Sequence, residues 1–255
     1  MILEQYDPEI NAVINPSDVY KKIEGMPSVA ICCYSYKTFI KLAKFFNGEV
    51  ITELTSANGT SPIYKINYKD KEFALFMNRV GAPLSVGTLE DAYQMGIEKI
   101  IVFGSCGVLD KSIKTFSIIL PNSAIRDEGT SYHYLPASEE IATNSKYLDT
   151  FKKLLEELEI KYIVGKTWTI DAFYRETEKK VALRKEQGCI CVEMEASANE
   201  ALAQFRNKDI IQFFYAADNL DAEKWQPRSL VGNSSLDAKI KVGILALELA
   251  TRISK

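Results

Sequence analysis

Short apolar runs alternate with longer amphipathic stretches along most of this chain. The runs have the length and the branched side chains of buried strands, and they fall at residues 29–33, 73–77, 99–103, 115–120, 162–170, 189–192 and 210–216. Helical spacing of apolar residues marks 38–46, 84–95, 146–158, 176–187, a stretch that ends at 205, and 236–253. This alternation predicts an α/β fold whose twisted, mixed and largely parallel central sheet is flanked by helices.

Glycine and proline mark where two of these elements are expected to end. Gly96 follows the helix at 84–95 and is its expected C-cap. Pro121 is expected to halt the strand at 115–120. No Gly/Ser/Pro-rich linker and no internal repeat interrupts the pattern, so residues 1–255 are interpreted as a single domain.

Several polar segments follow the predicted strands directly. They are residues 104–107, 171–175 and 193–195, together with Asp218. Ligands of open α/β sheets bind beyond the carboxyl ends of the strands. The ligand site is therefore expected where these segments meet.

Composition and charge narrow the classes of function. The chain has 47% hydrophobic and 25% charged residues and a net charge of −3. These values are typical of a globular protein without a basic surface for binding nucleic acid. The lysines at 239 and 241 are interpreted as a solvated helix face. No apolar run is long enough to span a membrane, and residues 1–7 do not resemble a signal peptide, so we expect a cytoplasmic protein that contacts neither membrane nor nucleic acid.

Cysteine and histidine are too few for a convincing metal site. The five cysteines are an odd number, which suits reduced thiols packed in a core. The chain has one histidine, His133, in the polar segment 126–134. Zinc sites need more thiolates or several imidazoles, so no metal is expected, and a lone histidine is more often structural than catalytic.

Two segments have both a structural and a functional interpretation. Gly104, Ser105, Cys106 and Gly107 follow a buried strand, and two glycines either make a tight turn or let the backbone approach a ligand closely. Their spacing is not that of a dinucleotide fingerprint. Phe173 ends another strand and either fills the core or stacks on a planar ring.

The carboxylates near these strands are open to the same two interpretations. Glu193 and Glu195 flank Met194 where a strand turns into a helix, where acids either favour the helix dipole or bind a polar ligand. Asp218 follows the next apolar run and is either a cap or turn residue or a buried functional acid.

Taken together and in order, these segments resemble the nucleoside phosphorylase family, which includes hexameric bacterial purine nucleoside phosphorylases and uridine phosphorylases. The resemblance runs from Val29 to the C-terminal helix. Residues 96–109 look like the family's central strand and glycine loop, and 192–198 match its Glu-Met-Glu ribose motif. Residues 127–133 look like a loop of the uridine phosphorylases.

The resemblance implies a role for each polar segment. Glu195 would bind the ribose hydroxyls above Met194, and Glu193 would support the site. Phe173 would stack on the base, beside Cys106 and Gly107. The resemblance also implies that no cofactor is needed, that inorganic phosphate is the co-substrate, and that the protein is a homodimer or a homohexamer.

The base remains open at this point. Asp218 stands where the purine enzymes hold the acid that protonates or hydrogen-bonds N7, which favours a purine. Residues 129–133 favour uridine instead. The sequence does not identify the base, the pentose or the pathway.

The phosphate residues of the family are largely replaced. Residues 34–38 stand where the family has Gly-Asp-Pro-x-Arg, Val102 stands where a second arginine is common, and 55–60 offer no third. Arginines are strong phosphate anchors, so their loss matters. Ser105 is matched, and Ser35, Lys37 or Arg79 are candidates to complete an altered site. Three alternatives follow: a phosphorylase, a nucleoside hydrolase, or a nucleoside-binding protein without turnover.

Overall fold

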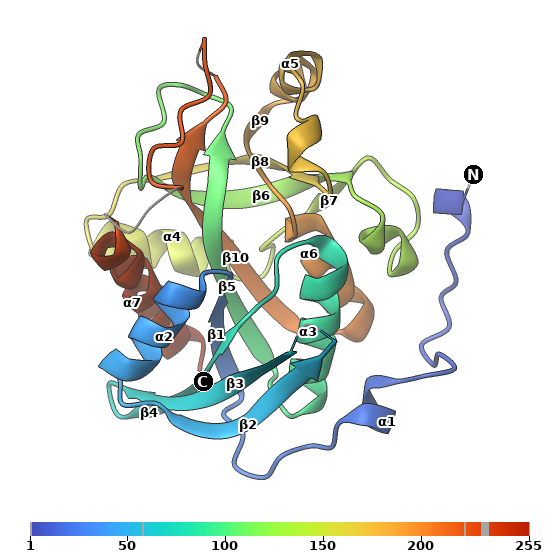
Figure 1. Cartoon of the computed structure of the whole chain (residues 1–255), viewed down its shortest axis with the longest axis vertical. Coiled ribbons are helices and arrows are strands. Elements are labelled where there is room, and N and C mark those ends of the chain that lie inside the picture. Colours follow the sequence, from blue (N-terminus) through green and yellow to red (C-terminus); the bar gives the residue numbers. More distant parts are fainter. Residues whose placement is uncertain (1, 58, 222, 231–234, 255) are drawn as a thin grey trace.

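A ten-stranded mixed sheet forms the centre of the structure, a computed structural model that describes residues 2–57, 59–221, 223–230 and 235–254 (Figure 1). The strands are β1 (Val29–Cys33), β2 (Glu49–Ser56), β3 (Gly59–Tyr68), β4 (Lys71–Met77), β5 (Lys99–Val108), β6 (Ile118–Asp127), β7 (Glu140–Ala142), β8 (Tyr162–Ile170), β9 (Cys189–Glu193) and β10 (Asp209–Asn219). Their order is β10-β6-β8-β9-β5-β1-β4-β3-β2, and β10 also pairs with β5, so five strands close on themselves.

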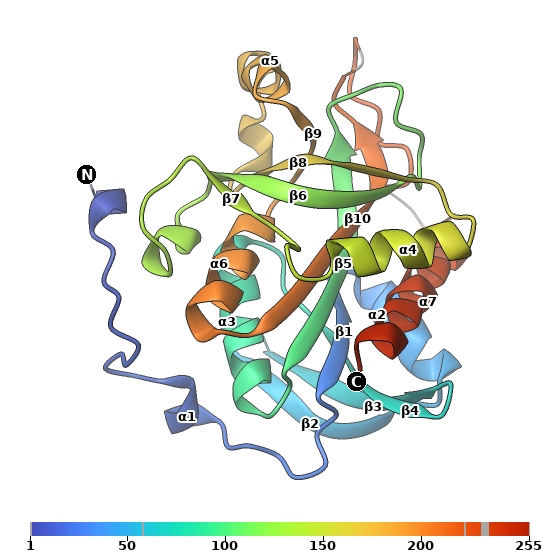
Figure 2. The ribbon, with the colours of Figure 1, turned by 180° about the vertical axis from the view of Figure 1, so that it is seen from behind.

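Helices cover both faces of this sheet. They are α1 (Pro16–Val19), α2 (Tyr36–Phe45), α3 (Ala82–Gln94), α4 (Leu148–Glu157), α5 (Glu178–Glu186), α6 (Ala196–Arg206) and α7 (Leu236–Ile253). Apolar residues of α2, α4 and α7 share one core with one face of β1, β5 and β10, and α3 and α6 pack against the other face (Figures 1 and 2). This arrangement confirms the predicted α/β class and the mixed sheet flanked by helices.

Parallel pairing brings the carboxyl ends of the central strands together. β5 pairs in parallel with β1 on one side and with β10 on the other. Both β5 and β10 run toward the end of the molecule where α5 lies, the upper end of Figure 1. Ser105 stands opposite Tyr215, and Gly107 stands opposite Asp218. The polar segments predicted to meet at this edge are therefore neighbours in the sheet.

Several element boundaries differ from the prediction. Residues 104–107 are part of β5 rather than a loop, and Asp218 lies inside β10 rather than in a cap or turn. Pro121 does not end a strand. It lies within β6 at a register shift against β8, where a ladder can tolerate a residue without an N–H group. Gly96 does follow α3 with a positive φ of 119°, as the C-cap prediction requires.

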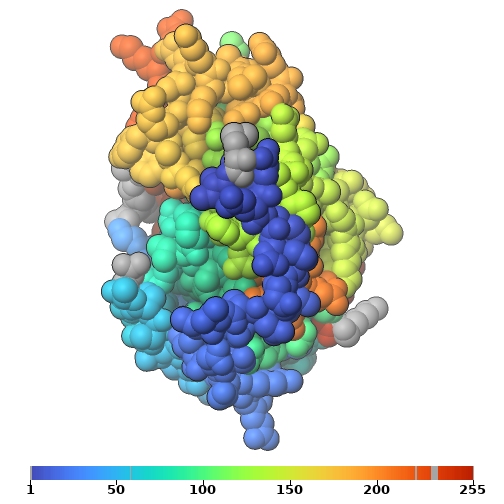
Figure 3. Space-filling model, turned by 90° about the vertical axis from the view of Figure 1, so that its right-hand side faces the viewer, coloured from blue at the N-terminus to red at the C-terminus, as the bar shows by residue number. Residues whose placement is uncertain are grey.

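The N-terminal segment lies along the outside of the molecule, in dark blue in Figure 3. Arg206 of α6 donates a hydrogen bond to the carbonyl oxygen of Ile10, and the Thr55 amide donates one to the Tyr20 hydroxyl. All five cysteines are buried and free, as predicted. Within the described ranges, no helix is long and apolar enough to cross a membrane.

Candidate active site

A cavity of about 1120 Å³ opens at the carboxyl edge of β5, β9 and β10. Its wall combines the ends of these strands with α5 and with the segment after β10. The residues of the predicted site that line it are Ser105, Cys106, Gly107, Phe173, Glu193, Met194, Glu195 and Asp218. The structure therefore brings together nearly all of the residues that the sequence singled out.

Asp218 reaches the cavity because β10 is irregular at this point. The register of β10 against β5 shifts between Ala216 and Asp218. The opposite residue, Gly107, leaves the room that the carboxylate occupies: a Cβ on Gly107 would lie 3.2 Å from Asp218 Oδ1 and only 2.5 Å from Leu220 Cδ1. A side chain at position 107 would therefore collide with Leu220 and press on Asp218.

The surroundings of Asp218 favour its protonated form. Burial raises the pKa of Asp218, and a 2.8 Å hydrogen bond from Trp225 Nε1 opposes that effect. Burial also raises the pKa of Glu176 to about 7, and the charge of Asp218 adds to this shift. Two carboxyl groups that disfavour each other's ionisation therefore share one end of the cavity.

Glu195 lies between the cavity and α3. It is 7% exposed and accepts a 2.6 Å hydrogen bond from the Gly81 amide. Burial, followed by the charge of Glu193, raises the pKa of Glu195 to about 8. The amides of Gly81 and Met194 oppose this shift, and the carboxyl group borders the cavity, so it can accept hydrogen bonds from hydroxyl groups of a ligand.

Glu193 is held by the protein itself. One oxygen accepts hydrogen bonds from the hydroxyls of Thr169 (2.6 Å) and Thr167 (3.3 Å). The other accepts from the amides of Glu195 (2.8 Å) and Ala196 (2.6 Å) at the start of α6. Such a carboxylate fixes the turn that carries Glu195 and caps the helix. This geometry favours a supporting role over direct ligand contact.

The remaining side chains add apolar surface to the cavity. Phe173 is half exposed, and its ring centroid lies 4.1 Å from that of Tyr174. Met194 borders the cavity between Glu193 and Glu195. An aromatic face in a cavity whose carboxyl groups have raised pKa values suits a planar, polar ring.

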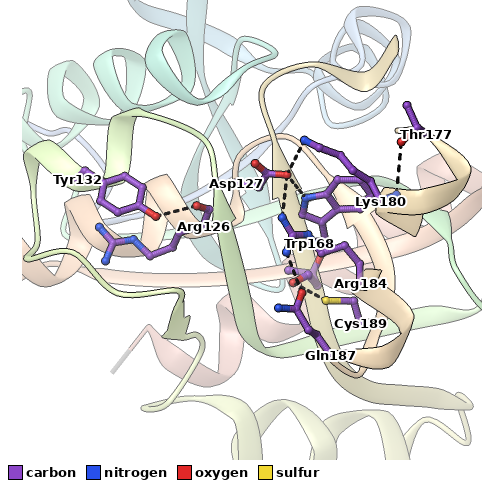
Figure 4. Close-up of polar contacts among 10 residues, drawn as sticks. Arg126, Asp127, Tyr132, Trp168, Thr177, Lys180, Arg184, Gln187 and Cys189 are labelled. Carbon is purple, nitrogen blue, oxygen red and sulfur yellow. Dashed lines mark hydrogen bonds and ion pairs between the residues drawn. The ribbon is translucent and has the colours of Figure 1, made fainter. Parts of the chain in front are cut away.

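A charged cluster holds α5 as one wall of the cavity (Figure 4). Asp127 Oδ2, at the end of β6, accepts hydrogen bonds from Trp168 Nε1 (3.0 Å), Lys180 Nζ (3.1 Å) and Arg184 Nη2 (3.0 Å). Burial raises the pKa of Asp127, but these three donors outweigh it and lower the pKa below its usual value. Lys180 and Arg184 belong to α5, whose neighbouring residues Val181 and Ala182 face the cavity.

The sequence model of the Phosphorylase superfamily matches residues 27–252. The chain belongs to the nucleoside phosphorylase family. It is 29% identical to the uncharacterized protein R802 of Acanthamoeba polyphaga mimivirus over 88% of this chain and 89% of that one. It is also 29% identical to the DeoD-type 1 purine nucleoside phosphorylase of Shewanella oneidensis over 77% of this chain and 79% of that protein.

A solved structure shares the fold of this family member. The uridine phosphorylase of Vibrio fischeri superimposes with a TM-score of 0.76 and 18% identity, over 95% of this chain and 100% of that one. The match confirms the predicted nucleoside phosphorylase-like fold.

In this nucleoside phosphorylase family member, the segment at 126–134 supports the site from outside. Glu128 accepts a 2.9 Å hydrogen bond from Ser197 Oγ on α6 and binds the amides of Thr130 and Ser131. His133 is exposed and is not among the described residues that line the cavity.

The four candidate phosphate residues do not lie together. Ser35 and Ser105 border a smaller cavity beside the main one. Neither Lys37 nor Arg79 is among the described residues that line either cavity, and Arg79 Nη2 instead donates a 2.8 Å hydrogen bond to the Gly59 carbonyl.

Three residues of the site carried weak signals in the sequence. Trp225 is separated from Asp218 by a polar segment with no pattern that predicts contact. Tyr34 was noted only as a departure from the family, yet it borders both cavities. Lys239 was interpreted as part of a solvated helix face. That interpretation is wrong for Lys239, which borders the smaller cavity, whereas Lys241 is exposed.

The cluster around Asp127 gives a first prediction. Asp127→Asn should lower stability by about 1–2 kcal/mol, because Lys180 and Arg184 lose their counter-charge at a partly exposed site. The melting temperature should fall by a few degrees, as measured by calorimetry. Because the folded-state pKa of Asp127 is lowered, this difference should be present at pH 7 and should vanish as the pH falls below about 4.

The matched control is Asp149→Asn, which removes an exposed carboxylate that pairs with Lys152 three residues along α4. We expect no measurable change in its melting temperature. Equal destabilisation by both substitutions would contradict the account of α5.

Proposed function

We propose that this protein cleaves the N-glycosidic bond of a ribonucleoside, with purines preferred, by phosphorolysis to the free base and ribose 1-phosphate. The observation that carries the proposal is the placement of Glu195 and Asp218 in one cavity, each a buried acid with a raised pKa, together with Phe173, which also lines it. The purine nucleoside phosphorylase among the relatives supports the same reaction.

In the proposed reaction, Glu195 acts on the sugar and Asp218 acts on the base. As the bond from C1′ to the base nitrogen breaks, its electron pair leaves with the base. Protonated Asp218 donates a proton to the purine ring and neutralises the departing charge. Glu195 binds the ribose hydroxyls and orients the sugar for attack at C1′. An oxygen of phosphate then forms the new bond to C1′.

The acid at position 218 supports the purine preference. A carboxyl group that keeps its proton can donate to a ring nitrogen with a lone pair, which purine N7 provides. We also propose that the enzyme needs no cofactor or metal and that it acts in the cytoplasm. The proposal also includes a homodimer or homohexamer, which the exposed apolar side chains of Val80, Phe173 and Tyr174 beside the cavity support.

Hydrolysis is the second candidate. The observation in its favour is that no arginine is found among the described residues that line the two cavities. A water molecule needs no cationic anchor, whereas phosphate does.

The experiment compares inosine, adenosine and uridine, each incubated with purified protein in the presence and absence of inorganic phosphate. Chromatography measures the released base. We expect release from the purine nucleosides only with phosphate. Release at the same rate without phosphate would establish hydrolysis, and binding without release from any of the three would reject both enzymatic proposals.

Trp225 gives a second prediction. Its hydrogen bond stabilises the ionised form of Asp218 and so opposes the effect of burial. Trp225→Phe keeps an aromatic ring but removes the donor, so the pKa of Asp218 should rise. In a pH profile of kcat/KM for inosine, the loss of activity on the alkaline side should move to higher pH. An unchanged alkaline limb would show that Asp218 is not the group that titrates.

A further inference from the structure

A cavity of about 210 Å³ adjoins the main cavity beside the carboxyl ends of β1 and β5. The two cavities share Tyr34, Val80, Ser105 and Leu230, so a group in the smaller one lies next to the main site. A water molecule takes about 30 Å³ in the liquid, so a small tetrahedral ion fits with room for waters. The polar residues that border this side cavity are Tyr34, Ser35, Thr38, Ser105, Tyr215 and Lys239.

The two cavities differ sharply in charge. Seven carboxyl groups border the main cavity: Glu176, Glu178, Glu193, Glu195, Asp218, Asp221 and Glu223. Its one described cation, Lys185, pairs with Asp221. The side cavity has no carboxyl group among its described residues and one cation, Lys239. The side cavity is therefore the better place for an anion, because its described lining has a cation and no carboxyl group.

Close packing of α7 on α2 directs Lys239 to this place. Gly243 lies so close to α2 that a Cβ there would meet Leu42 Cδ1 at 2.6 Å. Lys239 is one turn earlier on α7 and on the same face as Gly243. Its side chain therefore points toward the start of α2, where Ser35 is the N-cap. Figures 1 and 2 both show α2 and α7 side by side.

The ammonium group of Lys239 has no counter-charge among the residues that the structure describes. It makes no ion pair or hydrogen bond with any residue that the structure describes. Burial lowers its pKa, and the charge of nearby Lys37 lowers it further. A half-buried cation without a counter-charge is unfavourable unless a ligand supplies one.

Hydroxyl groups complete the surroundings of Lys239. Ser35 Oγ accepts hydrogen bonds from the Thr38 amide (3.3 Å) and the Thr38 hydroxyl (2.9 Å). Both contacts use its lone pairs, and the described residues offer no acceptor for its own proton, which it can donate to a ligand. Ser105 supplies another hydroxyl where the two cavities meet.

We propose that the side cavity binds the phosphate co-substrate and that Lys239 is its charged anchor, from the C-terminal helix. Lys239 then replaces the phosphate-binding arginines of the family. In this chain, residues 34–38 and Val102 stand where those arginines are expected. The catalytic part of this inference rests on the proposed function, whereas anion binding by Lys239 stands independently of it. Phosphate in this position lies beside Glu195 and the sugar rather than among the acids at the base end.

The experiment compares Lys239→Met and Lys239→Arg with a control, Lys241→Met, which removes an exposed lysine of the same helix. Calorimetric titration with inorganic phosphate measures binding without nucleoside, and initial rates with inosine measure the KM for phosphate. Circular dichroism checks that each variant is folded. We expect Lys239→Met to weaken phosphate binding and raise this KM by about 10- to 100-fold, with Lys239→Arg and Lys241→Met close to the wild type.

The two measurements separate this inference from the proposed function. Loss of phosphate binding in Lys239→Met alone supports the inference, even if the wild type cleaves nucleosides without phosphate and the proposed function fails. Unchanged phosphate binding in Lys239→Met overturns the inference, even if cleavage depends on phosphate. Equal weakening in Lys239→Met and Lys241→Met, or no binding by the wild type, also overturns it.

Discussion

Asp218→Asn should reduce the cleavage of purine nucleosides by about 10²-fold or more, the usual contribution of a positioned general acid. Asparagine can still accept the hydrogen bond from Trp225, so the geometry of the site is kept while the proton is lost. The effect should fall on kcat/KM for inosine, measured by base release. Residual uridine cleavage should change less, because a pyrimidine has no N7 to protonate.

The control for Asp218 is Asp209→Asn, at the opposite end of the same strand. Asp209 is bound by Lys146 and Tyr147, which hold its pKa below the usual value, so it has no proton to donate at neutral pH. We expect normal cleavage by the folded Asp209→Asn protein. An undiminished purine rate in Asp218→Asn would show that Asp218 is only structural.

Glu195→Gln should lower turnover on every nucleoside by about 10²-fold, because it replaces a carboxyl group that binds the sugar hydroxyls rather than the base. Rates with inosine, adenosine and uridine measure this. The control is Glu200→Gln on α6: Glu200 is also buried with a pKa raised to about 7, yet it is not among the described residues that line the cavity. Selective loss on one base would contradict a sugar contact.

The stability of Glu195→Gln should change in the opposite direction to its activity. The pKa of Glu195 is about 8 when folded and about 4.3 in an unfolded chain. The folded state therefore holds a proton that the unfolded state loses, and stability falls as the pH rises between these values, by on the order of a few kcal/mol. Glutamine does not titrate, so Glu195→Gln does not lose stability in this way. Its melting temperature should be higher than that of the wild type at pH 8 and nearly the same at pH 4.

The main features of the site could be predicted because they depend on local sequence. An apolar run followed by acids places those acids at the end of a strand, and this placement does not depend on distant parts of the chain. The predictions for Glu195 and Asp218 needed only this, and both residues line the cavity. The boundaries of β8 and α7 were predicted to the residue, because uninterrupted patterns define them.

Edge strands and irregular strands were harder to predict. β2 and β3 were missed because many of their residues face solvent, which weakens the apolar pattern. Pro121 was misread because the register shift that accommodates it depends on the partner strand β8. Long-range contacts have no local signal either. Lys239 lies beside Ser35 only because Gly243 lets α7 approach α2.

Phosphorolysis is the central claim, and the nature of the sugar product tests it most directly. The protein is incubated with inosine and inorganic phosphate, and phosphorus NMR follows the conversion of phosphate to a sugar phosphate as hypoxanthine appears. The account predicts one ribose 1-phosphate for each hypoxanthine released. Hypoxanthine together with free ribose, and an unchanged phosphate signal, would contradict it.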